Sequence, residues 1–208
     1  ITFANLPMPL VSVVTATYNR AHLIGETIRG VLNQSFEDFE YIIVDDGSED
    51  NTEAIVRAIP DSRIHFFKVP HTGRLSYLRN FCHTKCSGAL IAYVDSDDIW
   101  SPDKLEKQVT AMQSQPAAGF SFTDIELFDE RGTIRSGIYG KQGTEVRNVF
   151  PEMLSNELVI CHTTLVVRRS VMNGVGESDE TFLAGDHDFV FRLSREADAV
   201  IHYEPLVR

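Results

Sequence analysis

The stretch ALIAYVDSDDIWSPDK, residues 89–104, decides the fold, because it joins an apolar, strand-like run to a dense acidic cluster. Short apolar runs bounded by polar residues are typical of buried strands. Here the run ends in Asp95, Ser96, Asp97 and Asp98. Carboxylates so close together repel one another unless a cation lies between them, and hard oxygen ligands suit Mg²⁺ or Mn²⁺. The stretch therefore predicts a buried strand that ends at a divalent-cation site.

A second acidic pair stands upstream, again at the end of an apolar run. Residues 40–44, EYIIV, lead into Asp45, Asp46, Gly47 and Ser48. Mg²⁺ in proteins usually keeps several waters and binds one or two carboxylates together with substrate phosphates. The chain has no GxGxxG or Walker-type loop, so a diphosphate bound here would need a cation to neutralise its charge. The two acidic clusters together predict a metal-assisted nucleotide site.

Strand-like and helix-like patterns alternate through the first half of the chain. Strands are predicted at 11–16, 40–45, 64–69 and 90–94, and helices after Asn19, after Asp50 or Asn51, over 75–85 and after Ser101. This order predicts an α/β fold, with a Rossmann-like, mixed and mostly parallel sheet and helices on both faces. Ligands of such sheets bind outside the carboxyl ends of the strands, where residues 17–19, 45–48 and 95–98 all lie. We therefore expect three polar clusters to meet in one crevice.

The second half of the chain has a less regular pattern. Further strands are predicted at 120–128, 163–168 and 200–203, with a last helix that starts near Asp186. Residues 132–143 contain four glycines and predict an irregular loop, which could close over a ligand as a lid. We expect this half to complete the same sheet, and we expect the natural protein to extend past Arg208.

Composition narrows the class of protein. The 208 residues are 43% apolar and 24% charged, which is ordinary for a globular chain with a real core. The net charge of -11 argues against a nucleic-acid partner, because the phosphate backbone would be repelled. The three cysteines have no framework spacing and favour a reduced compartment. No apolar stretch approaches the roughly 20 residues of a membrane span, and no signal peptide begins the sequence, so we expect a soluble, cytoplasmic protein.

Five blocks of the sequence carry a resemblance to a known family. They are VSVVTATYNR (11–20), YIIVDDGSEDNT (41–52), GRLSYLRN (73–80), LIAYVDSDDIWSPDKLEKQ (90–108) and GDHDFVFRL (185–193). In this order and spacing, over about residues 9–205, the chain resembles family 2 of the inverting glycosyltransferases, which have the nucleotide-sugar-binding GT-A fold. The resemblance implies transfer of a sugar from a nucleoside diphosphate donor to an acceptor hydroxyl with inversion, in cell-surface polysaccharide synthesis. It also implies one domain over 1–208, with a nucleotide-binding half at about 9–130 and an acceptor-side half at about 131–208.

The resemblance implies a set of donor-site residues. Those expected to bind the nucleotide sugar are Thr17, Tyr18, Asn19, Asp46, Arg79, Asp95, Ser96 and Asp97. Asp97 matches the family's direct metal ligand, and Asp95 matches the partner that meets the metal through water or contacts the ribose. Asp46 matches the aspartate that accepts a hydrogen bond from the base. An acceptor-only carboxylate favours uracil or thymine, and hence a UDP-sugar, although guanine also presents donors.

The expected catalytic base is Asp186. Inversion requires one carboxylate within hydrogen-bond reach of the attacking hydroxyl, on the face opposite the leaving group. Asp186 takes that position of the family, but Gly185 stands where the family has an acidic residue, so Asp188 is the second candidate. An aspartate at a helix start also serves as a simple helix cap. Candidates on the acceptor side are His162, His187 and Trp100.

Two other functions stay open at this point. Gly185 in place of an acid fits a nucleotide-sugar-binding module that has lost catalysis. A nucleotidyltransferase also uses strand-end carboxylates and Mg²⁺, but it would need a glycine-rich basic loop after the first strand, where TATYNRAH has neither glycine nor lysine. The expected partners are a nucleoside diphosphate sugar and a saccharide or lipid-linked acceptor, with no nucleic acid. Flanking segments could hold the protein at the inner face of a membrane.

Overall fold

The computed structural model describes residues 8–180 and 185–208, and at residues 185 and 186 it describes the backbone alone. Its strands are β1 (Val11–Thr17), β2 (Phe39–Asp45), β3 (Ile64–Lys68), β4 (Leu90–Tyr93), β5 (Phe120–Asp129), β6 (Gly132–Ser136), β7 (Thr144–Arg147), β8 (Val166–Arg168) and β9 (Ala199–Val207). Its helices are α1 (Ile24–Leu32), α2 (Thr52–Arg57), α3 (Leu75–Lys85), α4 (Lys104–Ser114), α5 (Phe150–Leu154), α6 (Arg169–Val175) and α7 (Gly185–Glu196), with a 3₁₀ turn η1 at His162–Thr164.

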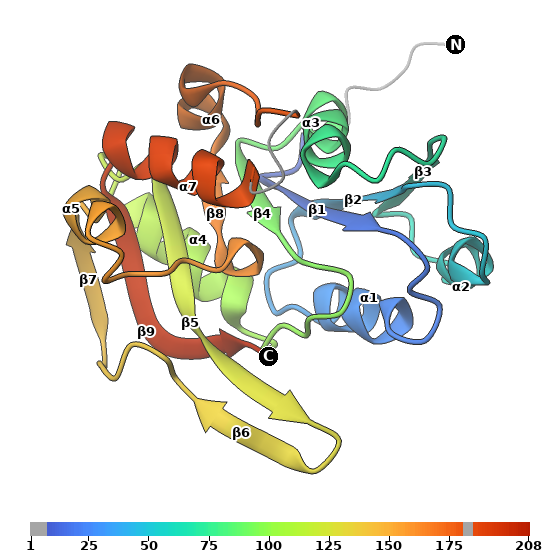
Figure 1. The fold of residues 1–208 in the computed structure, drawn as a ribbon, viewed down its shortest axis with the longest axis horizontal. Helices are drawn as coiled ribbons and strands as arrows, with labels where there is room; N and C mark the ends of the chain where they lie inside the picture. The colour runs from blue at the N-terminus through green and yellow to red at the C-terminus, as the bar shows by residue number, and fades with distance from the viewer. Residues whose placement is uncertain (1–7, 181–184) are drawn as a thin grey trace.

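One mixed sheet organises the described residues. Its strands follow the order β3-β2-β1-β4-β8-β5-β9-β7, with β6 paired to β5 off this path (Figure 1). β1 is parallel to β2 and β4, and β2 is parallel to β3. β8 runs antiparallel to both β4 and β5, and β9 is parallel to β5 and antiparallel to β7. The predicted α/β fold is confirmed, and the second half of the chain completes the sheet that the first half begins.

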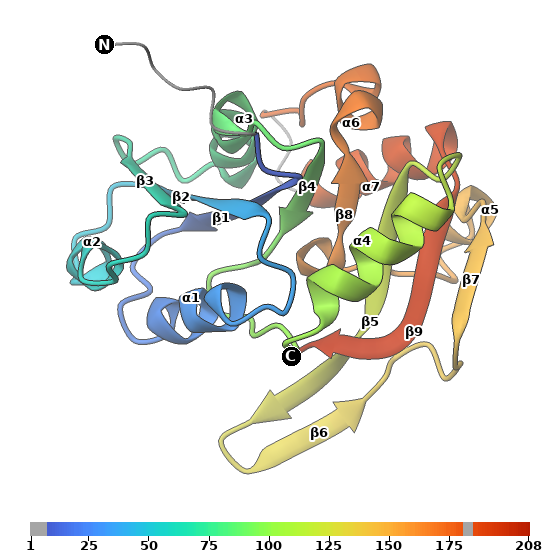
Figure 2. The same ribbon diagram turned by 180° about the vertical axis from the view of Figure 1, so that it is seen from behind.

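Helices cover both faces of the sheet, as expected (Figures 1 and 2). Successive side chains of a strand point to opposite faces, so neighbours in β1 enter different cores. Val14 packs in the core that contains side chains of α3, α6 and α7, and Val13 packs in the core that contains side chains of α1, α2 and α4. Strands buried on both faces explain the continuous apolar runs in the sequence. The loops at the strand ends therefore extend from a sheet that is packed on both faces.

The carboxyl ends of β1, β2 and β4 lie side by side. Thr17 is paired in register with Asp45, and Val14 with Tyr93, so the segments after these strands leave the sheet at one edge. The segment after β4 is also joined to the end of β9. The Ile99 N–H donates to the Arg208 carbonyl at 2.6 Å, and the Arg208 N–H donates to the Ile99 carbonyl at 2.9 Å. The acidic segment is therefore held by a strand at each of its ends.

The structure corrects the predicted starts of two helices. Asn19 does not cap a helix, because α1 begins only at Ile24 and Asn19 has a φ of 51°. α4 begins at Lys104, with Asp103 rather than Ser101 at the N-cap position. In both cases the polar residue lies in the loop before the helix, where Asn19 bonds to the loop after β2 and the Ser101 N–H donates to the Leu206 carbonyl of β9.

The predicted loop over 132–143 is wrong in its first part. Residues 132–136 form β6, which pairs with β5 across a tight turn. The predicted strand at 163–168 is also shorter than expected, because 162–164 form η1 and only Val166–Arg168 belong to β8. Three elements were not predicted at all, namely β7, α5 and α6. They are short, and none of them has an apolar pattern long enough to show its period.

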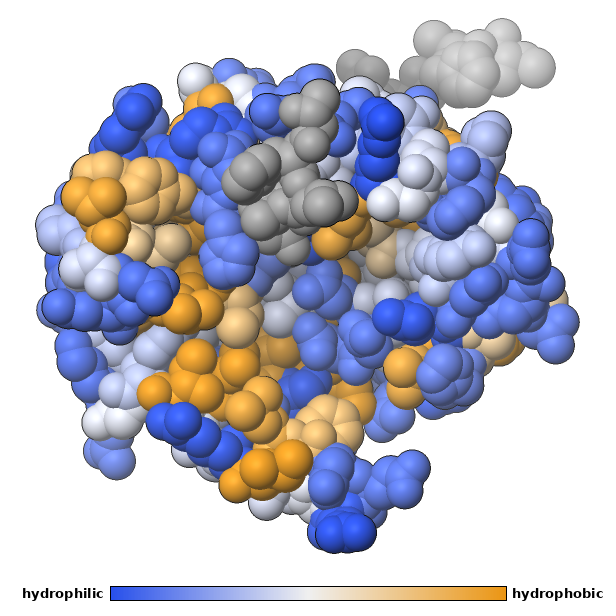
Figure 3. All heavy atoms as spheres, in the orientation of Figure 1, coloured by the Kyte–Doolittle hydropathy of each residue, from blue (hydrophilic) through white to orange (hydrophobic). Residues whose placement is uncertain are grey.

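The β5–β6 hairpin exposes apolar side chains to solvent. Leu127, Phe128 and Ile134 are 44%, 41% and 66% exposed. In the space-filling view, hydrophobic residues gather over this part of the molecule, whereas the surface over the ends of β1 and β2 is mainly polar (Figure 3). Among the described residues, no helix is long and apolar enough to cross a membrane.

Candidate active site

A cleft of about 370 Å³ lies at the carboxyl ends of β1, β2 and β4. It is lined by Ala16, Thr17, Tyr18, Arg20, Asp46, His71, Gly73, Arg74, Leu75, Leu78, Asp95, Ser96 and Asp97. Six of the eight expected donor-site residues are in this set. The structure therefore brings the three polar clusters together, at the edge where an open α/β sheet binds its ligands.

Thr17 closes β1 at the floor of the cleft. Its side chain is 3% exposed, and its hydroxyl oxygen has no hydrogen-bond partner among the described residues. Buried hydroxyls are normally hydrogen-bonded, so an unpaired one that lines a cleft is a candidate contact for a ligand.

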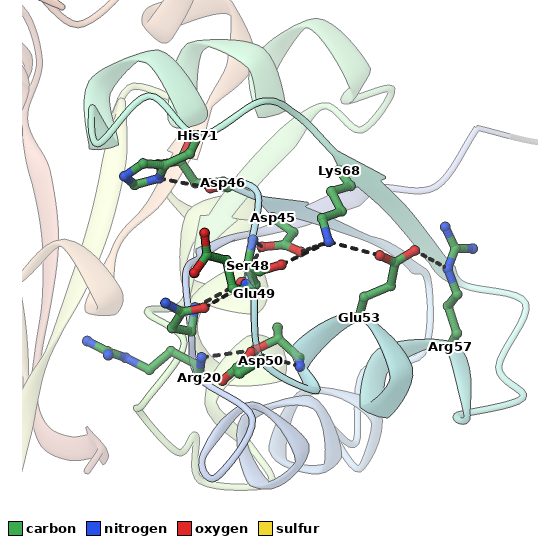
Figure 4. Close-up of polar contacts among 12 residues, drawn as sticks. Arg20, Asp45, Asp46, Ser48, Glu49, Asp50, Glu53, Arg57, Lys68 and His71 are labelled. Atoms are coloured by element: carbon green, nitrogen blue, oxygen red, sulfur yellow. Dashed lines mark hydrogen bonds and ion pairs between the residues drawn. The ribbon is translucent and has the colours of Figure 1, made fainter.

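The loop after β2 is fixed by its own polar groups (Figure 4). Asp45 Oδ1 accepts hydrogen bonds from the backbone N–H (3.0 Å) and the hydroxyl of Ser48, as expected for a turn partner. Ser48 Oγ accepts in turn from the Asn19 N–H at 2.8 Å. Asn19 Oδ1 accepts from the Glu49 N–H at 2.9 Å, so the Asn19 side chain braces the loop rather than lining the cleft.

Asp46 is engaged on both carboxylate oxygens by the segment after β3. Oδ1 accepts from the backbone N–H (2.8 Å) and the hydroxyl (3.0 Å) of Thr72, and Oδ2 accepts from the Gly73 N–H at 2.8 Å. The His71 Nδ1 atom lies 2.9 Å from Oδ2 and 3.0 Å from the Asp46 carbonyl oxygen. These four donors leave Asp46 only 2% exposed.

Tyr18 and His71 form a stacked pair at the mouth of the cleft. Their ring centroids are 4.2 Å apart and their planes differ by 20°. Tyr18 is 36% exposed, and half of the His71 side chain is accessible to solvent. At the outer end of the cleft, one face of the Tyr18 ring is thus already covered by the His71 ring.

Arg79 of α3 is buried and does not line the cleft, but it holds one of the strand-end carboxylates that do. Its Nη2 atom donates to Asp95 Oδ1 at 3.1 Å, while the Asp95 side chain stays 43% exposed. Burial lowers the pKa of the Arg79 guanidinium, and the charge of Asp95 opposes that shift. An arginine keeps its charge in proteins, so this ion pair fixes the Asp95 carboxylate at the edge of the cleft.

Asp97 and Asp98 differ sharply in their surroundings. Asp97 is 44% exposed and lies 3.5 Å from Arg20 Nε. Burial raises the pKa of Asp98 to about 7, and the neighbouring charges of Asp95 and Asp97 add to that rise. Asp95 and Asp97 line the cleft, whereas Asp98 is partly buried and does not line it.

Thr163 of η1 supports the acidic segment from below. Its hydroxyl accepts from the Asp95 N–H at 3.3 Å, and its carbonyl accepts from Trp100 Nε1 at 3.3 Å. Thr163 could not be predicted from the sequence, because a lone threonine 68 residues after Asp95 and 63 residues after Trp100 gives no sign of these contacts.

Two of the three acceptor-side candidates lie in the protein core. Trp100 is 3% exposed and packs against the Lys104 ammonium group, which lies 4.0 Å from its ring centroid. His162 is 6% exposed, and its ring meets the ring of Tyr93 edge-on at 4.3 Å. Neither residue lines this cleft, although Trp100 lines a second hollow beside Ile99 and Val207, so the acceptor-side role of both residues stays a prediction.

The candidate bases belong to the first turn of α7. The Asp186 side chain lies outside the described part of the chain, so the expectation for it remains a prediction. His187 is exposed. Asp188 is bound within its own helix, because its Oδ2 accepts from Arg192 Nε at 2.9 Å. The second candidate base is therefore already paired with a cation.

The sequence profile described as Glycosyl transferase family 2 matches residues 12–175, which is most of the chain. The protein belongs to this family. The match includes all of the residues that line the cleft of this family 2 chain.

Curated relatives of this chain include named bacterial glycosyltransferases. One is named the teichuronic acid biosynthesis glycosyltransferase TuaG of Bacillus subtilis, which is 36% identical over 163 residues, or 77% of this chain and 63% of the relative. Another is WfgD of Escherichia coli, named UDP-Glc:alpha-D-GlcNAc-diphosphoundecaprenol beta-1,3-glucosyltransferase, which is 32% identical over 79% of this chain and 62% of the relative. The family 2 chain thus spans about three fifths of the length of these relatives.

Solved structures share the fold. Residues 1–349 of Staphylococcus aureus TarS in complex with UDP-GlcNAc superpose with a TM-score of 0.79 at 19% identity, over 95% of this chain and 57% of that one. The mannosyltransferase PcManGT of Pyrobaculum calidifontis in complex with GDP-Man and Mn²⁺ gives a TM-score of 0.69 at 18% identity, over 94% and 57%. The likeness confirms the GT-A fold of this family 2 chain.

The cleft suits a cation that shares its ligands with a substrate. In residues 8–180 and 185–208, no three His, Cys, Asp or Glu side chains come together as a metal-binding group. Asp95 and Asp97 nevertheless offer hard carboxylate oxygens on the cleft surface. Mg²⁺ and Mn²⁺ sites of this kind are completed by phosphate oxygens and water. The residues present therefore fit a divalent cation bound together with a diphosphate.

Three polar residues of the cleft were not among the expected site residues, namely Arg20, His71 and Arg74. Arg20 follows the TYN block directly, just after β1, and that position alone was a signal. His71 follows β3, whose end carries no acidic cluster. Strand order shows why it matters, because β3 lies next to β2 and its exit loop folds back over Asp46.

Proposed function

We propose that this protein is an inverting glycosyltransferase, which moves a sugar from a nucleoside diphosphate donor to an acceptor hydroxyl in cell-surface polysaccharide synthesis. The observation that carries the proposal is the single cleft in which an aromatic and carboxylate pair, Tyr18 and Asp46, lies beside the exposed carboxylates of Asp95 and Asp97. The first pair suits a nucleobase, and the second suits a cation with a diphosphate.

In this proposal the donor lies along the carboxyl ends of the strands. The base stacks at Tyr18, beside the carboxylate of Asp46 and Thr17 Oγ1, which is unpaired within the part of the chain that the structure describes. An acceptor-only carboxylate selects bases with a ring N–H, so we favour a UDP-sugar. Arg79 keeps Asp95 in place for the ribose or the cation, and Asp97 provides the direct metal ligand.

A bound Mn²⁺ or Mg²⁺ would supply charge neutralisation for the departing nucleoside diphosphate. The chain itself has to remove a proton from the acceptor hydroxyl as the new glycosidic bond forms. We assign that step to Asp186, because Asp188 is held by Arg192. Attack from the side opposite the leaving group inverts the anomeric carbon.

The setting follows from the relatives. TuaG is named for teichuronic acid and WfgD for a diphosphoundecaprenol-linked acceptor, which supports a saccharide or lipid-linked acceptor for this chain. We place the reaction in the cytoplasm, at the inner face of the membrane, where such an acceptor would be reached. The apolar β5–β6 hairpin is compatible with an acceptor that carries a lipid.

The test combines binding with turnover. Thermal shift with UDP, GDP, dTDP and CMP, each with and without Mn²⁺, should give the largest stabilisation for UDP with Mn²⁺, because a ligand of the native state raises stability by mass action. Asp97→Asn should abolish the Mn²⁺-dependent part and lower transfer about 100-fold or more. Asp186→Asn should leave binding intact and lower transfer about 100-fold or more.

Asp38→Asn is the matched control, because Asp38 is exposed just before β2, at the opposite edge of the sheet. This variant should bind and turn over like the unchanged protein. Donor binding without turnover on any acceptor would favour a module that has lost catalysis, as Gly185 allows. Release of pyrophosphate from nucleoside triphosphates would favour a nucleotidyltransferase. Absence of nucleotide binding would exclude all three functions.

A further inference from the structure

A planar ring already occupies the aromatic face of the cleft. The His71 imidazole stacks on Tyr18 at a centroid distance of 4.2 Å, which is the separation of two rings in contact. A second flat group cannot enter between rings at this distance. Any base that stacks on this face of Tyr18 must first move the imidazole away.

The same imidazole uses the polar contact that a base would need. His71 Nδ1 lies 2.9 Å from Asp46 Oδ2 and 3.0 Å from the Asp46 carbonyl oxygen. Both atoms are acceptors, so Nδ1 carries the hydrogen. A carboxylate has about four acceptor positions, and Thr72 and Gly73 fill three of them. Asp46 can accept from a ligand only if one of its present donors leaves.

His71 is the donor that can leave at least cost. The other three bonds come from two backbone N–H groups and the short Thr72 side chain, which move only with the loop. The His71 side chain is half exposed and can turn into solvent with the backbone unchanged. Its departure frees one acceptor position on Asp46 and one face of Tyr18 together.

We propose that His71 takes the place of the nucleobase in the free protein, and that a donor binds by displacing it. This inference rests on the proposed function and adds a residue that sets base affinity and base choice. A base succeeds only if it replaces both contacts, by stacking on Tyr18 and donating a ring N–H to Asp46. Uracil, thymine and guanine carry such an N–H, whereas cytosine presents an acceptor nitrogen that the carboxylate would repel.

The test is calorimetric titration of the whole chain with UDP and Mn²⁺. When a binding-competent state is only partly populated, the apparent affinity falls by that fraction. Removal of the competing ring in His71→Ala should therefore tighten UDP binding, with an expected fall in Kd of about three- to tenfold. Mn²⁺ with inorganic pyrophosphate, which has no base, should bind both proteins within about twofold of each other.

His65→Ala is the matched control, because His65 is similarly exposed but lies beside Glu40, away from the cleft. Its Kd for UDP should equal that of the unchanged protein. Circular dichroism and urea unfolding establish that His71→Ala is folded. A second measurement follows the proton signal of the His71 ring in the unchanged protein by NMR. The signal is assigned by its absence in His71→Ala. Its chemical shift should change when UDP is added, because the ring then leaves the face of Tyr18.

Three outcomes overturn the proposal. If His71→Ala binds UDP with the same affinity as the unchanged protein, the ring does not compete with the base. If the variant binds UDP more weakly, the ring holds the base in place instead. An equal gain for UDP and pyrophosphate would show that the effect does not concern the base. If no variant binds any nucleoside diphosphate, the proposed function itself fails, which the unchanged protein alone reveals.

Discussion

His162 has two ring nitrogens that are buried and lack a hydrogen-bond partner in the described structure. Its ring packs against Tyr93 and Phe189, and burial lowers its pKa well below the ordinary value, so it is neutral. A buried polar group without a partner costs about 1–3 kcal/mol. The burial of His162 without hydrogen-bond partners therefore lowers the free energy of unfolding.

Replacement of His162 by Phe should stabilise the protein. The new ring keeps the aromatic contacts and removes both unpaired nitrogens, so we expect the free energy of unfolding to rise by about 1 kcal/mol. In thermal denaturation the midpoint should increase by about 2–4 °C for a chain of this size. His65→Phe, at an exposed position, should leave the midpoint unchanged. A lower midpoint for His162→Phe would mean that the nitrogens are solvated in the folded protein.

The role of single residues was only partly predictable. A carboxylate after an apolar run could be assigned to the binding edge, because parallel strands end together, and Asp46, Asp95 and Asp97 do lie there. The partners of these carboxylates could not be assigned. Asp46 is bound by residues 71–73, about 25 positions downstream, and such contacts depend on how two loops fold over each other.

At the scale of elements, the connection after β2 depends on a glycine. Gly47 has a φ of +73°, and a Cβ atom there would lie 2.8 Å from the His71 backbone nitrogen and 3.2 Å from the Val69 carbonyl oxygen. No L side chain fits without moving the segment after β3. The two loops that carry Asp46 and His71 are therefore in direct van der Waals contact.

Gly47→Ala should destabilise the protein and weaken nucleotide binding. Left-handed backbone costs an alanine roughly 1–2 kcal/mol, and the overlap with the neighbouring backbone adds to this, so we expect about 2–4 kcal/mol from urea unfolding. Gly140→Ala separates the two causes, because Gly140 has a φ of +65° and nothing lies within 4 Å of an added Cβ. Equal losses in the two variants would contradict the predicted overlap.

The elements that the sequence predicted well are those with buried faces. β1, β2 and β4 are buried along nearly their whole length, and α3 was predicted with its observed limits, Leu75–Lys85. β6 is exposed at every residue and α5 has no buried residue, so neither leaves a periodic apolar signal. These elements form because they pair with or pack against other strands and helices.

For the molecule as a whole, two buried histidines, His162 and His202, and the partly buried His83 couple stability to pH. Burial lowers the pKa of His83 and of His202 to about 4 each, and that of His162 well below its usual value. The charges of Lys104 and Lys107 lower the pKa of His202 further, and Glu204 opposes them. In the unfolded chain these side chains have pKa values near 6.5. Below that pH the unfolded state binds more protons, so stability falls as pH falls from about 6.5 toward 4.

Urea unfolding at pH 7.5 and pH 5 should show this loss. Each histidine contributes up to about 2 kcal/mol of loss between these two values. Asp98 acts in the opposite direction, because its raised pKa of about 7 makes the folded state bind a proton in this range, and so it offsets part of the loss. His202→Gln removes one titrating histidine, so its loss of stability over the same range should be smaller by up to about 2 kcal/mol. An identical pH dependence in the variant would mean that His202 is accessible to protons in the folded protein. Measurements stop at pH 5 because carboxylates with lowered pKa values, such as Glu40, add a separate loss below about pH 4.5.

The paired backbones of Ile99 and Arg208 give the acidic segment an anchor that is synthesised well after the segment itself. A ribosome-bound chain that has already made β1 to β4 still lacks the residues that fix the far side of its carboxylates. The ability to bind a cation should therefore appear only after β9 has joined the sheet. Nascent fragments that end before β9 would contain the same aspartates, but these side chains would not be held at fixed distances from one another.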